Sequence, residues 1–301
     1  MKDSIHRIPA SIKFFQEGDL NGIGLKKLGQ YLKEKTRIPI YFHGNIYDGL
    51  PKKRVEEVAK ALARIKVKDP GKRFTPLEGP AIYGRDVERK CSFIVEDGVK
   101  APSFLTGFTL GMPLQAEIDY EERRIRSPEW KVFGILYEGV WYQEIISDLI
   151  FRGQQDSDHC FILLTNQLFG TWDREDQRYH ARASLYGFPH LISISGVVEA
   201  PAKPKEFYLK KQMGLPLELL KKEYEGRFLD HGDLRMTEVL KGYVMQALFF
   251  HLMGNAFCED RDCRLFNSHW QEDVLHSQMD GPYEFCPKHE AILKELRDRS
   301  K

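Results

Sequence analysis

Apolar and polar residues near the N-terminus alternate between a strand-like and a helix-like spacing. Residues 11–16 form a short apolar run typical of a strand, and glycines at positions 18, 22 and 24 indicate the turn after it. Residues 25–35 carry apolar side chains at helical spacing, and residues 38–43 predict a second strand. Such a β-α-β unit favours a parallel or mixed sheet with helices packed against it.

The pattern along the rest of the chain predicts a second series of strands and helices. The expected elements are a helix over 54–65, a strand over 132–137, a helix over 141–151, a buried strand running into a loop over 160–170, and a strand over 190–198. Glycine, proline and charge in 68–130 indicate irregular structure with a few short strands, 171–182 forms a polar excursion, and 199–207 is a proline-punctuated connection.

A long apolar stripe over residues 234–253 gives the clearest helix prediction. Asp233 is the expected N-cap, and Gly254-Asn255 supplies the left-handed stop. We therefore predict an α/β (α+β) protein with a mixed sheet packed by helices. A boundary near Ser127-Pro128 would divide an N-terminal β-α-β region, 1–130, from a domain over 131–301, unless the two form one continuous domain.

The composition and net charge of the chain indicate which classes of partner to expect. The 301 residues are 42% hydrophobic and 30% charged, with a net charge of +1, so we expect neither a nucleic-acid nor a membrane partner. Because no apolar run reaches membrane-spanning length and no signal peptide is evident, a cytoplasmic location is expected. A peptide or a small molecule is the expected ligand, and the oligomeric state is left open.

Three of the five cysteines cluster with a histidine near the C-terminus. Cys258-x4-Cys263 is followed by Cys286-x2-His289, and each pair can close on one ion. Three thiolates and one imidazole in a closed tetrahedron predict a structural zinc site, although a group of buried free cysteines is the alternative. The odd cysteine count argues against a disulfide framework. Cys160 is interpreted as a core residue and Cys91 as a reduced bystander.

The C-terminal part resembles the archaemetzincins, a family of zinc metallopeptidases. Their signature is a helix with H-E-x-x-H-x-x-G-x-x-H followed by C-x4-C and later by C-x2-C, and here residues 247–258 align through His251, Gly254 and Cys258. Residues 163–169 and 235–241 also fit, so the resemblance covers about 130–301 and implies a metzincin-like fold with a C-terminal zinc knuckle. The whole chain also resembles a group of archaeal metallopeptidase-like proteins, through residues 178–182, 196–204 and 266–273.

The peptidase motif itself is degenerate. By this alignment Ala247 replaces the first metal-binding histidine, Leu248 the general-base glutamate and Phe257 the third histidine, while His251 remains. A catalytic zinc needs three ligands and a carboxylate that deprotonates its water, which these side chains do not supply. His289 replaces the last knuckle cysteine and is still a ligand.

A relocated site is the alternative that keeps catalysis open. His269, Glu272 and His276 fall on one face of a predicted helix, where two imidazoles and a carboxylate could hold a second metal if that face turns toward His251. In that case His251 and Glu272 would be the catalytic residues. An ordinary surface helix explains the spacing equally, and His251 could be a core histidine.

Arg178, His180 and Arg182 form a further candidate site. Arginines around a histidine could bind a carboxylate or a phosphate, whereas an edge strand or loop with solvated charges is the plainer interpretation.

Taken together, the residues predict a metzincin-like zinc protein that is inactive as a peptidase of the three-histidine type and uses the old cleft for binding. The alternative is a metal-dependent hydrolase built from His251, His269, Glu272 and His276, so the sequence leaves enzymatic activity undecided.

Overall fold

The computed structural model describes residues 5–73, 113–127, 134–151 and 158–300. Its strands are β1 Ser11–Glu17, β2 Ile40–Asn45, β3 Leu136–Glu138, β4 His159–Thr165, β5 Leu168–Asp173, β6 Arg178–Arg182, β7 Ser184–Leu185 and β8 His190–Ser193. Its helices are α1 Leu25–Thr36, α2 Lys52–Arg64, α3 Gln115–Arg126, α4 Gly139–Phe151, α5 Ile194–Glu199, α6 Lys205–Gln212, α7 Leu217–Glu223, α8 Met236–Met253, α9 Gln271–Leu275, the π-helix η1 His276–Asp280 and α10 Pro287–Arg299.

A five-stranded mixed sheet forms the centre of the molecule, in the order β2-β1-β4-β8-β7. The first four strands are parallel, with Ile12 opposite both Ile40 and Cys160, and β7 closes the edge antiparallel to β8. A second sheet has the order β3-β5-β6. The expected mixed sheet is therefore confirmed, and the regions 1–130 and 131–301 contribute strands to the same sheet.

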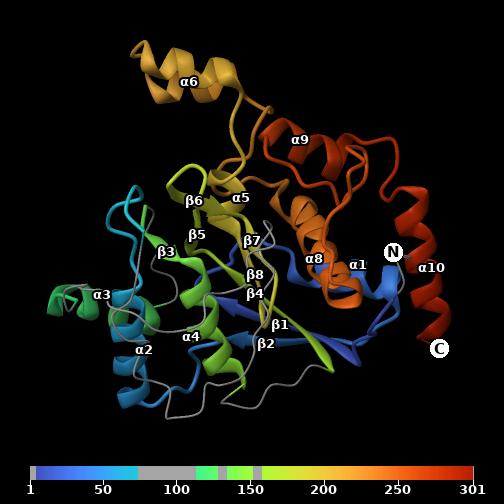
Figure 1. The fold of residues 1–301 in the computed structure, drawn as a ribbon, viewed down its shortest axis with the longest axis horizontal. Helices are drawn as coiled ribbons and strands as arrows, with labels where there is room; N and C mark the ends of the chain where they lie inside the picture. The colour runs from blue at the N-terminus through green and yellow to red at the C-terminus, as the bar shows by residue number, and fades with distance from the viewer. Residues whose placement is uncertain (1–4, 74–112, 128–133, 152–157, 301) are drawn as a thin grey trace.

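Helices cover the two faces of the five-stranded sheet because its central strands are apolar on both sides. In β4, Ile162 and Leu164 pack in a core cluster with α1, α8 and α10, while Leu163 packs in another cluster with α2 and α4. Buried parallel strands read as continuous apolar runs for this reason. Figure 1 shows α8 and α10 on one side of the strands, α2 and α4 on the other, and α6 projecting away from both sheets.

The N-terminal β-α-β unit and the long C-terminal helix are confirmed. Helix α8 begins at Met236 with Arg235 as its N-cap, so the expected N-cap at Asp233 is wrong; Asp233 Oδ1 instead accepts a hydrogen bond from the Arg235 backbone N–H at 2.8 Å in the turn before the helix. Gly254 ends the helix with φ of 74°, the left-handed conformation expected of a glycine there.

Two expected strands are wrong in part. The run over 160–170 divides into β4 and β5 at Asn166-Gln167, because the Gln167 N–H bonds to Thr165 Oγ1 at 2.9 Å and turns the chain. The run over 190–198 is a strand only to Ser193, whose Oγ accepts a hydrogen bond from the Gly196 N–H at 2.7 Å and caps helix α5. An N-cap of this kind starts a helix even in a sequence of β-branched residues.

Three less regular segments also contain elements that the pattern did not predict. The polar excursion 171–182 is the hairpin of β5 and β6, the end of 68–130 contains helix α3, and α6 begins inside the connection 199–207. The predicted strand over 132–137 lies partly outside the described residues, as do Cys91 and most of 68–130. Within the described parts of the chain, no helix combines the length and apolar character that a membrane crossing requires.

Candidate metal centres

The predicted zinc knuckle is assembled by two short turns after α8. The backbone N–H of Cys258 bonds to Leu265 O at 2.9 Å, and that of Cys263 bonds to Asp260 O at 3.0 Å, which folds the first pair back on itself. Cys286 is the N-cap of α10, and its N–H points to Cys263 Sγ at 3.5 Å. His289 lies in the first turn of α10, and its Nδ1 points to the sulfur atoms of Cys263 and Cys286.

The four side chains converge at distances that suit a tetrahedral ion. Their ligand atoms all lie within 4.8 Å of one another. Sγ of Cys258 and Sγ of Cys286 are 3.9 Å apart, and His289 Nδ1 lies 3.1 Å from Cys286 Sγ and 3.7 Å from Cys263 Sγ. Zinc bonds of about 2.3 Å to sulfur and about 2.0 Å to nitrogen would place two sulfurs about 3.8 Å apart and sulfur and nitrogen about 3.5 Å apart. The donor set therefore fits a closed metal site.

Burial of the knuckle residues changes the pKa of a thiol and brings the His289 ring against α8. Burial raises the pKa of the Cys263 thiol to about 12, so a nearby cation is needed to favour the thiolate at neutral pH. His289 is 2% exposed, and its ring meets the Phe249 ring of α8 edge-on, with centroids 5.2 Å apart. The site thus ties α10 to α8.

A second group of metal-ligating side chains was not predicted. Cys160, His190 and His251 bring one ligand atom each to within 4.8 Å of the others. Cys160 lies on β4, His190 begins β8, and His251 lies in the last turn of α8. Cys160 is a buried core residue, as expected, but the expectation that it has no neighbouring candidate ligands is wrong. The three positions are far apart in sequence, so no spacing motif could have revealed them.

Burial keeps both histidines of this group neutral. Burial, and then the charge of His251, lower the pKa of His190 to about 3. Burial, followed by the charges of Arg7 and His159, lowers the pKa of His251 to about 4. Neutral imidazole is the form that binds metal ions.

The residues proposed for a relocated site lie apart from His251. Oε1 of Glu272 pairs with Arg227 at 2.7 Å, and His276 Nε2 contacts Asp262 Oδ1 at 2.5 Å. Helix α9 ends at Leu275, so His276 falls in the π-helix η1 instead of on a shared α-helical face. Among the described residues, these side chains and His251 do not form one of the groups close enough to hold a metal.

The arginine and histidine side chains of β6 have local partners. His180 Nε2 contacts Asp176 Oδ2 at 2.8 Å, and Arg178 Nε lies 3.3 Å from His180 Nε2. Arg182 Nε donates to Thr171 Oγ1 at 2.8 Å. Arg178 and His180 thus belong to the β5–β6 hairpin, and Arg182 lies at the rim of a pocket.

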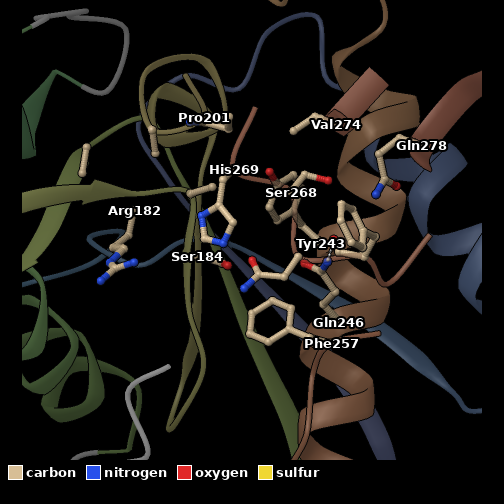
Figure 2. Close-up of a pocket in the computed structure, with 15 residues that line it drawn as sticks. Arg182, Ser184, Pro201, Tyr243, Gln246, Phe257, Ser268, His269, Val274 and Gln278 are labelled. Atoms are coloured by element: carbon tan, nitrogen blue, oxygen red, sulfur yellow. Dashed lines mark hydrogen bonds between the residues drawn. The ribbon is translucent and has the colours of Figure 1, made fainter. Parts of the chain in front are cut away.

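That pocket, of about 80 Å³, lies between the end of β6, the start of β7 and helix α8. Figure 2 shows His269 beside Ser184, with Tyr243 and Gln246 of α8 across the opening and Phe257 at its edge. The Gln246 side chain is fixed from both ends, because its Oε1 accepts from Tyr186 OH at 2.8 Å and its Nε2 donates to Phe266 O at 3.2 Å.

Comparison with known proteins identifies a family. The model of a family described as "Probable metallopeptidase family (DUF6775)" matches residues 103–296, which is more than half of the 301-residue chain. Neither the curated proteins nor the solved structures contain a match to the chain.

Proposed function

The chain belongs to this probable metallopeptidase family, and from that premise we propose that it is a metzincin-like zinc protein that binds peptides but does not cleave them by the three-histidine mechanism. The zinc ion of the proposal is structural and is held by the C-terminal knuckle.

The observation that carries the proposal is the environment of the degenerate motif. Ala247 and Leu248 are 0% exposed and belong to the apolar core. Phe257 packs on Tyr186, with ring centroids 5.8 Å apart. A catalytic zinc requires an open position for water and a carboxylate beside it, and these apolar contacts provide neither.

The knuckle supports a structural role for the metal. Cys258, Cys263, Cys286 and His289 would fill all four positions of a tetrahedral ion, and zinc is the ion that this donor set suits. When bound, the ion would supply folding energy by joining the turn after α8 to the start of α10. His289 then acts as a positioned ligand, held by the Phe249 ring.

The proposed peptide site is the pocket beside β6 and β7. Both strands lie at the edges of their sheets, and edge strands bind extended peptides through the backbone. The pocket volume of about 80 Å³ suits one small side chain, and Ser268 and His269 offer polar groups to it.

Peptide cleavage and peptide binding test the proposal with the zinc-loaded full chain. We expect no cleavage of casein or of a mixed hexapeptide library beyond that of a chelator-treated sample, as followed by mass spectrometry. The wild type should bind a subset of an arrayed hexapeptide library, and Ser184→Trp, which fills the pocket, should weaken that binding at least tenfold.

Glu218→Trp on exposed α7 is the matched control and should bind like the wild type. Chelator-sensitive cleavage that disappears in His251→Ala would overturn the proposal in favour of a metal-dependent hydrolase. Equal peptide binding by wild type and Ser184→Trp would show that this pocket is not the peptide-binding site.

A further inference from the structure

We propose that Cys160, His190 and His251 form a second metal site, which binds one thiophilic cation such as Zn²⁺ between the central sheet and α8. This site is separate from the C-terminal knuckle and does not depend on whether the protein binds or cleaves peptides.

Strand pairing brings the first two ligands to the same face of the sheet. In the parallel register of β4 and β8, His190 lies opposite Ile162, two residues after Cys160. Side chains two apart in a strand share a face. Ile162 and Ile192 both pack in the core cluster that contains α8, so Cys160 and His190 face this helix.

Helix α8 supplies the third ligand from its last turn. The His190 and His251 rings are 6.3 Å apart between centroids and are inclined by 71°, so their edges can point to a common ion. With the ligand atoms of all three residues within 4.8 Å of one another, a small rotation of each side chain reaches bonding distance.

An unsatisfied nitrogen indicates that a ligand belongs here. His251 Nε2 is buried and has no hydrogen-bond partner among the described residues. A buried polar atom without a partner is destabilising, and native structures rarely keep one without a reason. A metal bond to this nitrogen removes that destabilisation.

Metal binding to His190 requires the loss of a hydrogen bond that its ring accepts. The Gly187 N–H donates to His190 Nδ1 at 3.2 Å, so the proton of the neutral ring lies on Nε2. A metal at Nδ1 replaces this hydrogen bond, and a metal at Nε2 moves the ring proton to Nδ1 and breaks it. In both cases the Gly187 N–H gives up one long hydrogen bond, Cys160 releases its thiol proton to solvent as it becomes a thiolate, and the new bonds to the metal offset these losses.

The donor set selects the chemical class of the ion. One thiolate and two imidazoles suit zinc and other borderline or soft cations, and they disfavour magnesium and calcium, which prefer oxygen ligands. The same residues do not form a nucleophilic site, because a substrate cannot reach Cys160, which is 0% exposed. Burial also raises the pKa of its thiol.

Metal content and cobalt spectroscopy test the proposal on the full chain. We expect the purified wild type, after loading with Zn²⁺ and dialysis, to retain two zinc ions per chain by elemental analysis. Cys160→Ser and His251→Asn should each retain one. Loading with Co²⁺ should give a thiolate-to-cobalt absorption band whose intensity falls in Cys160→Ser.

His159→Asn is the matched control, since His159 neighbours Cys160 on β4 but lies outside the group, and it should retain both ions. Cys263→Ser identifies the knuckle ion separately. One zinc ion per wild-type chain, or two in both Cys160→Ser and His251→Asn, would overturn the proposal. If Cys160→Ser fails to fold, His251→Asn decides alone, because the His251 side chain is only partly buried while Cys160 is fully buried.

Discussion

Glu17, at the end of β1, is 0% exposed and lies in a network of buried polar groups. Arg124 Nη1 of α3 donates to its Oε1 at 2.8 Å, and Tyr47 OH donates to the same oxygen at 2.6 Å. Thr165 Oγ1 donates to Oε2 at 2.6 Å, and Tyr142 OH also donates there. Burial favours the neutral acid, but the Arg124 charge and these hydrogen bonds outweigh it and lower the pKa of Glu17.

This carboxylate makes folding stability depend on acidity. Because the folded-state pKa lies below the unfolded value, the stabilisation is complete above about pH 4.5 and is lost as pH falls through the folded pKa. We expect Glu17→Gln to lower the free energy of unfolding by about 3 kcal/mol at pH 7, since it leaves Arg124 with one fewer buried partner. The difference from wild type should shrink below pH 4.5 in urea titrations. A constant difference at all pH values would contradict this assignment.

At the same scale, the sequence predicts some side-chain groups and misses others. The pairs Cys258 with Cys263 and Cys286 with His289 are visible because each pair is separated by only a few residues. Contacts such as Glu17 with Arg124, or Cys160 with His251, join distant positions and depend on how strands and helices pack.

Helix α5 is the element that departs furthest from the expected pattern. Its residues look strand-like, yet Gly196 allows the helix to lie directly on the chain between β6 and β7. A Cβ atom at position 196 would be 2.2 Å from Arg182 O and 2.9 Å from the Ala183 Cα, and both of these are backbone atoms. The close approach therefore needs a glycine.

Gly196→Ala tests this packing. We expect a loss of about 1–3 kcal/mol in the free energy of unfolding, because backbone atoms must shift to admit the methyl group. The control is Gly71→Ala, where the nearest atom to a new Cβ is an Asp69 carboxylate oxygen at 3.4 Å. Chemical unfolding of both variants provides the measurement, and equal stabilities would refute the close approach.

Among the elements, those with a strong local pattern were predicted well. Helices α1 and α2 are amphipathic and pack their apolar faces on the core, whereas α8 is apolar over most of its length and is buried on nearly all sides. The short elements α5 and β5 were missed, because side-chain hydrogen bonds from Ser193 and Thr165 decide where a strand ends. Such bonds compete with regular backbone pairing.

For the whole molecule, the knuckle residues link the C-terminal helix to the central core. Cys263 and Cys286 belong to the same apolar cluster as β1, β4 and α8, and Arg297 Nη1 of α10 donates to Lys35 O after α1 at 3.2 Å. Loss of the ion leaves buried thiols and an imidazole where metal bonds held the turn, so the effect should be regional.

Metal removal should therefore loosen the C-terminal part before the rest. We expect a chelator to increase hydrogen exchange in α10 and in the turn after α8, while the β1 and β4 amides remain protected. Cys263→Ser should reproduce this result without chelator, which separates the knuckle from the Cys160–His190–His251 group. Unchanged exchange in α10 would show that the knuckle does not stabilise this region.

The sequence by itself determined the central β-α-β unit, the long helix and the grouping of Cys258, Cys263, Cys286 and His289. These features depend on spacing over a few residues, which the local backbone sets. Only the tertiary structure decided that Glu272 and His276 turn to Arg227 and Asp262, and that Cys160 and His190 meet His251. Those contacts join positions 14 to 91 residues apart in the sequence and depend on strand register and helix packing, which no local pattern encodes.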